Sequence, residues 1–125
     1  MTYFFDNNIS PRLARILRLL DVHAVALREE FAQDTPDHVY LTEIKQRGWT
    51  LVTCDGRVRT RPPESLALRT AGITSVFIRS FFLEMNLWDQ AIWLLRHWRE
   101  IDQYLSVHRH GVPYIVKQRG RLEPV

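Results

Sequence analysis

Three aspartates stand where carboxylates can do chemistry. Asp6 follows the apolar segment 3–5, Asp55 follows the apolar segment 51–54, and Asp37 opens a segment with helix signals. In an open α/β sheet, ligands bind in the crevice beyond the carboxyl ends of the strands, where Asp6 and Asp55 are expected. Carboxylates gathered in one crevice repel one another unless a divalent cation holds them. We therefore expect metal-assisted phosphoryl chemistry.

Alternating strand and helix signals indicate the elements that position these acids. Five segments have strand character, namely 2–6, 22–27, 49–53, 74–78 and 113–117. Helices are expected after position 10, over 37–48, over 62–72 and from 86 to about 105. Strands that alternate with helices at this spacing predict βαβ units and a mainly parallel sheet. The chain is thus expected to be an α/β protein.

Capping residues mark the predicted helix ends. Ser10 precedes Pro11, which is the usual N-cap followed by proline at the first helical position. The pair Thr35-Pro36 repeats that start, and Gly48 is a C-terminal stop. The last helix begins at Asn86 as its cap. Beyond it, Gly120 indicates a turn before Leu122.

The position of the strands in the sheet decides whether the acids meet. Asp6 and Asp55 come together only if the first and third strands are neighbours. The order second, first, third, fourth achieves this and has its switch point between the first and third strands. The helix that begins at Asp37 then directs its first turn at the same crevice.

The residues around these acids resemble a PIN domain. Over 37–55, a helix begins with an acid, ends at Gly48 and leads into a strand that closes in Thr53-Cys54-Asp55. The 18-residue separation of Asp37 and Asp55 is similar to that in VapC-type toxins. The start of the chain, with Asp6, resembles the family's opening strand and first acid. The segments 7–11 and 55–64 are similar to the compact PIN-like branch of toxin–antitoxin proteins.

This resemblance covers roughly residues 2–80 and implies both fold and activity. The implied fold has three layers, with a central, mainly parallel sheet flanked by helices, and we expect one PIN-like domain over residues 1–125. The implied activity is that of a toxin endoribonuclease that hydrolyses RNA phosphodiester bonds with Mg²⁺ or Mn²⁺. The matching catalytic and metal-site acids are Asp6, Asp37 and Asp55. The expected supporting residues are Thr53, Asn7 and Glu64.

A further acid of the VapC pattern has no clear equivalent here. VapC-type domains usually place it on a helix between the first acid and the equivalent of Asp37, and that insertion is nearly absent. The acids in or near the remaining loops are Glu29, Glu30, Asp34 and Glu64. The fourth ligand is therefore open.

Basic and aromatic residues suggest partners. RNA phosphates are expected to bind the arginines that follow the last motif acid, namely Arg57, Arg59 and Arg61. Arg96 and Arg99 are a weaker choice for the same role. On the long helix, helical spacing places an aromatic group away from the expected core, and this group is a candidate interface for an antitoxin or a second copy of the chain: Trp93, His97 and Tyr104. The alternative is that the C-terminal strand partly covers these side chains.

Composition excludes some classes of protein. The chain has 125 residues, of which 46% are apolar, and no apolar stretch long enough to span a membrane. Its net charge of +3 is compatible with a polyanionic partner. A single cysteine, Cys54, excludes an intrachain disulfide, fits the cytoplasm and is expected to be a core residue.

Two other functions fit parts of the pattern. One is a non-catalytic PIN-like module that binds RNA or an antitoxin, which the missing fourth acid favours. The other is a phospho-acceptor receiver domain, which usually has paired acids after its first strand and a lysine after a later one. Here asparagines follow Asp6, and Arg79 stands after the fourth strand, so this alternative ranks last.

Overall fold

The computed structural model describes residues 1–54 and 72–125. Within these ranges a six-stranded sheet has the order β2-β1-β3-β4-β5-β6. The strands are β1 (Tyr3–Phe5), β2 (Ala24–Ala26), β3 (Thr50–Thr53), β4 (Ser75–Ile78), β5 (Pro113–Val116) and β6 (Leu122–Pro124). The pairs from β2 to β5 are parallel, and β6 is antiparallel to β5. This confirms the expected order of the first four strands and adds β6 as a strand that was not expected.

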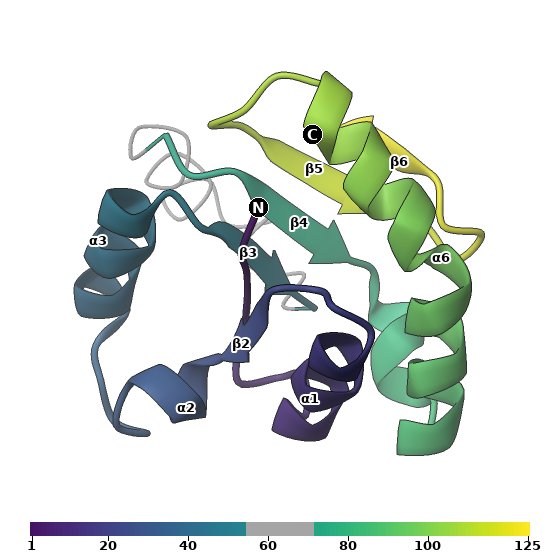
Figure 1. Cartoon of the computed structure of the whole chain (residues 1–125), viewed down its shortest axis with the longest axis horizontal. Helices are drawn as coiled ribbons and strands as arrows, with labels where there is room; N and C mark the ends of the chain where they lie inside the picture. The colour runs from purple at the N-terminus through teal and green to yellow at the C-terminus, as the bar shows by residue number, and fades with distance from the viewer. Residues whose placement is uncertain (55–71) are drawn as a thin grey trace.

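Helices cover both faces of the sheet, so the expected three-layer α/β fold is confirmed (Figure 1). On one face lie α1 (Pro11–Leu19) and α6 (Leu87–Val107), and α3 (Asp37–Arg47) lies on the other. Two short helical elements lie in the connections: α2 (Leu27–Glu30) between β2 and α3, and the 3-10 helix η1 (Ser80–Glu84) between β4 and α6. Among the helices in the described ranges, none is both long and apolar enough to cross a membrane.

Strand β1 contributes to both cores because successive side chains of a strand point to opposite faces. Tyr3 and Phe5 belong to the cluster under α1 and α6, where the Tyr3 ring packs edge-on against Trp98 at 4.8 Å between centroids. Phe4 belongs to the cluster under α3 and stacks on Tyr40 at 5.9 Å. The same alternation places the next side chain, that of Asp6, on the α3 face.

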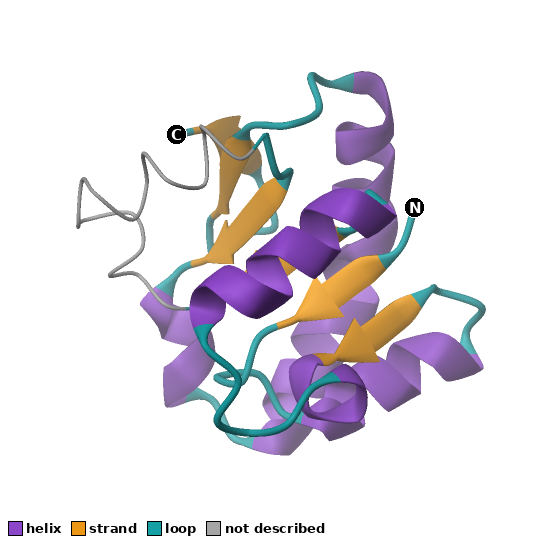
Figure 2. Ribbon diagram, turned by 90° about the vertical axis from the view of Figure 1, so that its left-hand side faces the viewer, coloured by secondary structure: helices purple, strands orange, loops and turns teal. Residues whose placement is uncertain are grey.

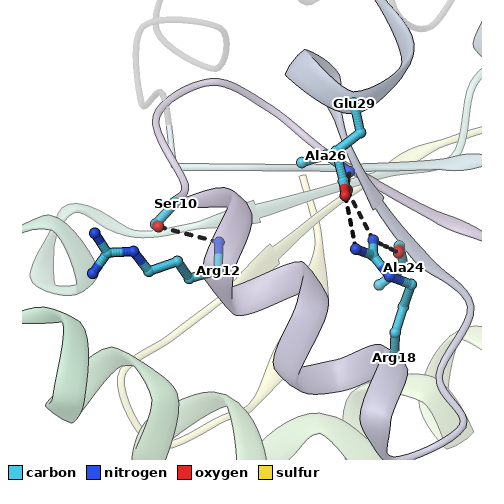
Figure 3. Close-up of polar contacts among 6 residues, drawn as sticks. All are labelled: Ser10, Arg12, Arg18, Ala24, Ala26 and Glu29. Carbon is cyan, nitrogen blue, oxygen red and sulfur yellow. Dashed lines mark hydrogen bonds and ion pairs between the residues drawn. The ribbon is translucent and has the colours of Figure 1, made fainter.

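Most of the predicted caps are present. The Ser10 hydroxyl accepts a hydrogen bond from the Arg12 N–H at 3.3 Å (Figure 3), and Asn86 Oδ1 accepts one from the Asp89 N–H at 2.8 Å. Gly48 ends α3 in the left-handed conformation, with φ of 67°. The predicted cap at Thr35 is wrong. Pro36 occupies the N-cap position of α3, and no side chain caps that end.

The segment expected as a charged loop after β2 begins instead with the short helix α2. Glu29 turns back to accept a hydrogen bond from the Ala26 N–H at 2.9 Å. Its two carboxylate oxygens also bind the Arg18 guanidinium at 2.8 and 2.7 Å, and Arg18 donates to the Ala24 carbonyl at 2.7 Å (Figure 3). The ion pair therefore fastens α1 and α2 to the edge strand β2.

Candidate active site

Asp6, Asn8 and Thr53 form a hydrogen-bonded group, which we call the acid corner. The Thr53 hydroxyl donates to Asp6 Oδ2 at 3.0 Å, and the Asn7 N–H donates to Asp6 Oδ1 at 2.7 Å. The Asn8 amide group donates to Thr53 Oγ1 at 3.3 Å, while Asn8 Oδ1 accepts from the Cys54 N–H at 3.2 Å. These bonds fix the orientation of the Asp6 carboxylate.

The acid corner exists because β1 and β3 are neighbours. In the parallel register Phe5 lies opposite Val52, so that Asp6 and Thr53 follow side by side. The Asp6 N–H continues the ladder by donating to the Val52 carbonyl at 2.9 Å. Phe4 and Leu51, two residues earlier on each strand, are both in the cluster under α3. The side chains of Asp6 and Thr53 therefore lie at the carboxyl edge of the sheet and on the same face.

Cys54 adjoins the acid corner but faces the other core. It is 1% exposed and belongs to the cluster under α1 and α6. Burial, with a smaller effect from the nearby Asp6 carboxylate, raises the pKa of the Cys54 thiol to about 12. A protonated thiol is a poor nucleophile at neutral pH. The expectation that Cys54 is a core residue is therefore confirmed.

Asp37 is the first residue of α3 and has an exposed side chain. The Tyr40 hydroxyl, one helical turn on, donates to Asp37 Oδ1 at 3.0 Å. Because α3 ends at Arg47, just before β3, its last turn lies at the amino edge of the sheet. A helix of its 11 residues is about 16 Å long, so its first turn lies toward the carboxyl edge. Figure 2 shows that end of α3 on the side to which the strand arrows point.

The donors that are described suit a hard cation. Mg²⁺ and Mn²⁺ prefer oxygen ligands, and the acid corner presents a carboxylate beside a hydroxyl and an amide oxygen. Within residues 1–54 and 72–125, no group of three or more His, Cys, Asp or Glu side chains is placed to hold a metal ion. The third predicted acid, Asp55, lies outside the described residues.

Several other predicted site residues also lie outside the described ranges, and their roles stay predictions. They are Glu64, Arg57, Arg59 and Arg61. The side chain of Asn7 is exposed, and its printed contact to the site is made by its backbone N–H. The Asn8 side chain, which was not among the predicted site residues, contacts Thr53 instead.

Two acids that were open as a fourth ligand are engaged elsewhere. The Arg18 guanidinium beside Glu29 lowers the pKa of that carboxyl, with a further contribution from the Ala26 N–H. Glu30 pairs with Arg47 at 3.2 Å. Both carboxylates therefore fasten α2 to its neighbours and are poor candidates for a metal ligand.

The expected exposed aromatic group on α6 is wrong for Trp93. Trp93 is 7% exposed, and its indole N–H donates to the Gln118 carbonyl at 2.8 Å. His97 and Tyr104 are half-buried, and His97 packs against Gly120. The alternative that the C-terminal segment covers these side chains is therefore confirmed. Near its N-terminal end, α6 exposes a different apolar stripe, formed by Trp88, Ile92 and Leu95.

Two contacts of the site correspond to sequence patterns that could have predicted them. Tyr40 follows Asp37 by three residues, which is the spacing of neighbours on a helix surface. Asn8 follows Asp6 by two residues in a turn, where asparagine often bonds to nearby backbone. The partner of Asn8 is 46 residues away, however, and only the sheet order brings it near.

Comparison with known proteins identifies a matching family. A family model described as a PIN-like domain matches residues 1–80, which is more than half of the chain. No curated protein and no solved structure matches the chain. PIN-like domains are generally nucleases and commonly use divalent metals.

Proposed function

The chain belongs to the PIN-like domain family, and from this premise we propose that it is a metal-dependent endoribonuclease. Its substrate is RNA, its reaction is hydrolysis of phosphodiester bonds, and its biological role is that of the toxin in a toxin–antitoxin pair. The observation that carries the proposal is the acid corner. Asp6 is fixed at the switch point of a parallel sheet, where this class of fold binds ligands.

Asp6, Asp37 and Asp55 are the acids that would hold Mg²⁺ or Mn²⁺ in this proposal. A bound divalent ion supplies an acidified water and compensates charge on the phosphate. Thr53 and Asn8 act on Asp6 by holding its carboxylate in one orientation. The Tyr40 hydroxyl does the same for Asp37. The arginines at 57, 59 and 61 remain candidates for binding RNA phosphates, and Glu64 for a supporting acid.

The proposal is tested with an unstructured, labelled single-stranded RNA. The parent chain should cleave it in Mn²⁺ or Mg²⁺, stop when the metal is chelated, and resume when metal is restored. Asp6→Asn keeps the size of the side chain but removes its charge, so cleavage should fall by at least about 100-fold. Asp21→Asn is the matched control, because it removes the same charge from an exposed turn that precedes β2, at the amino end of that strand. It should cleave as the parent does.

The result for Asp6→Asn tests the role of Asp6 when both variants keep the parent circular dichroism spectrum, which shows that they are folded. Cleavage by Asp6→Asn at the parent rate would refute the role of Asp6. Cleavage that resists chelation would refute the metal dependence.

A second candidate is a non-catalytic module that binds RNA or an antitoxin. The stripe Trp88, Ile92 and Leu95 supports it, because these side chains are 78%, 42% and 45% exposed at i, i+4 and i+7 on one helix face. An exposed apolar stripe of this kind suits the apolar face of a partner helix. RNA binding without turnover, even in Mn²⁺, would favour this candidate over the enzyme.

A further inference from the structure

The C-terminal hairpin carries a group of cations outside the acid corner. It consists of β5, β6 and the turn between them, and its exposed basic residues are Lys117, Arg119 and Arg121. Lys117 pairs with Glu123 at 3.2 Å. Within the described part of the chain, no carboxylate forms an ion pair with Arg119 or Arg121. Two arginines in one short turn therefore keep their charge available to a ligand.

The hairpin turn lies at the same edge of the sheet as the acid corner. Strands β1, β3, β4 and β5 are all parallel, so their carboxyl ends line up. Arg79 follows β4 and lies beside Lys117, since its N–H donates to the Val116 carbonyl at 3.3 Å. The row along this edge thus runs from Asp6 through the end of β3 to Arg79 and Lys117.

These cations also share a face with the acid corner. Phe77 and Ile115 belong to the cluster under α3, and Arg79 and Lys117, two residues later in each case, directly follow the ends of β4 and β5. Alternation therefore places both cations on the α3 face, as it does Asp6. Arg121 lies opposite Lys117, where cross-strand neighbours share a face, and the Lys117 N–H donates to its carbonyl at 2.9 Å.

Strand spacing sets the scale of this row. Neighbouring strands are about 4.8 Å apart, so Arg79 lies about 10 Å along the edge from Asp6, and Lys117 about 14 Å. An open hollow of about 830 Å³ beside the hairpin is lined by Lys117, Arg119 and Arg121 together with one acid, Glu123. A single line of cations that ends in an open hollow matches one extended polyanionic backbone.

The position of the hairpin is fixed before any ligand binds. Trp93 of α6 holds the turn through the Gln118 carbonyl. Gly120 has φ of 82° and lies so close to His97 that an added Cβ would come within 2.4 Å of Nδ1. Because α6 anchors the turn in this way, its cations do not have to be ordered at the moment of binding.

We infer that Arg79, Lys117, Arg119 and Arg121 form a cation track that binds the phosphate backbone of single-stranded RNA and leads it to the acid corner. The inference rests on the proposed function and extends it to the C-terminal hairpin, which lies beyond the family match of residues 1–80. The track supplies affinity without reading sequence, because its contacts are with phosphates.

The test measures binding separately from cleavage. Fluorescence anisotropy of a labelled, unstructured single-stranded RNA is recorded over a range of salt concentrations, in chelator, so that metal-dependent turnover is suppressed. For Arg119→Ala/Arg121→Ala, loss of two phosphate contacts should weaken binding roughly 25-fold at 0.1 M salt and lower the salt slope by about 1.4. Arg119→Lys/Arg121→Lys keeps both charges and should bind nearly as the parent does.

Arg15→Ala/Arg109→Ala is the matched control, because it removes the same charge from exposed positions outside this row. Arg15 lies on α1, which covers the other face of the sheet, and Arg109 precedes β5, at the amino edge of the sheet. This variant should retain most of the parent affinity. Equal weakening by both alanine pairs, or parent affinity in Arg119→Ala/Arg121→Ala, would overturn the cation track. If the parent still cleaves RNA in that case, the proposed function stands. Weakening confined to the hairpin pair, with no cleavage in Mn²⁺, would keep the track and refute the enzyme.

Discussion

The acid corner and the C-terminal hairpin lie along the same edge of the sheet, but different interactions hold them. Asp6 is held by directional hydrogen bonds from Thr53 and the Asn7 backbone. Backbone hydrogen bonds close the hairpin turn, and the buried Trp93, with one hydrogen bond to Gln118, holds it against α6. Hydrogen bonds contribute modest net free energy but fix orientation, whereas aromatic burial contributes more free energy and little direction. A carboxylate that binds a metal must be held in one orientation, which hydrogen bonds provide. A turn that presents charge must be held in place, which aromatic burial provides.

The largest expected effect on stability comes from removing the anchor of the hairpin. Trp93→Ala should lower the free energy of unfolding by about 3–5 kcal/mol, since it leaves a cavity against Phe81 and Phe82 and frees the turn. Trp88→Ala is the matched control, because Trp88 is 78% exposed, and its effect should stay within about 0.5 kcal/mol. Urea unfolding measures both. Similar losses in the two variants would show that Trp93 is not an anchor.

A smaller loss of stability, but a specific loss of activity, is expected at the acid corner. Asn8→Ala leaves the Cys54 N–H without its acceptor, which should cost about 1–2 kcal/mol of unfolding free energy. Thr53 then holds Asp6 less firmly, so RNA cleavage should fall by about 100-fold. Cleavage rates and urea unfolding are measured together on each variant.

The variant Asn7→Ala distinguishes the role of Asn7 from that of its neighbour Asn8. Asn7 acts on Asp6 through its backbone N–H, which alanine keeps, so both readouts should stay near those of the parent. If Asn7→Ala proved as damaging as Asn8→Ala, the side-chain role assigned to Asn8 would be wrong.

The smallest expected effect is a pH dependence of the hairpin contact. Burial lowers the pKa of His97 below its ordinary value of 6.5; Arg96 also lowers it, and Glu100 acts in the opposite sense. Between the two pKa values the unfolded chain binds more protons than the folded one, so stability is greatest above pH 6.5 and falls as the pH drops below it. His97→Gln should remove this part of the slope in urea unfolding measured from pH 8 to pH 5.5. An unchanged slope would contradict the prediction.

Local signals predicted the part of the molecule that depends on near neighbours. The Ser10 and Asn86 caps and the stop at Gly48 follow from residues a few positions apart. The order of the first four strands was expected on a different ground, because it lets Asp6 and Asp55 meet. Thr35 failed as a cap because Pro36 takes that position itself.

Contacts between distant segments could not be predicted in the same way. Trp93 was expected on an exposed face because helical spacing takes no account of segments outside the helix. Its hydrogen-bond partner, Gln118, is 25 positions later. The contacts of Asn8 could not be predicted for the same reason, because its partner Cys54 is 46 positions later. The alignment of Arg79 and Lys117 with Asp6 depends on the place of β5 beside β4, which no local pattern encodes.

The central claim is that Asp6 belongs to a site for a divalent cation, and the most direct test is Mn²⁺ binding measured by isothermal titration calorimetry. The parent chain should bind Mn²⁺, and Asp6→Asn should lose most of that affinity while Asp21→Asn keeps it. Binding of Mn²⁺ to Asp6→Asn with the affinity of the parent, or no binding to the parent itself, would contradict the account.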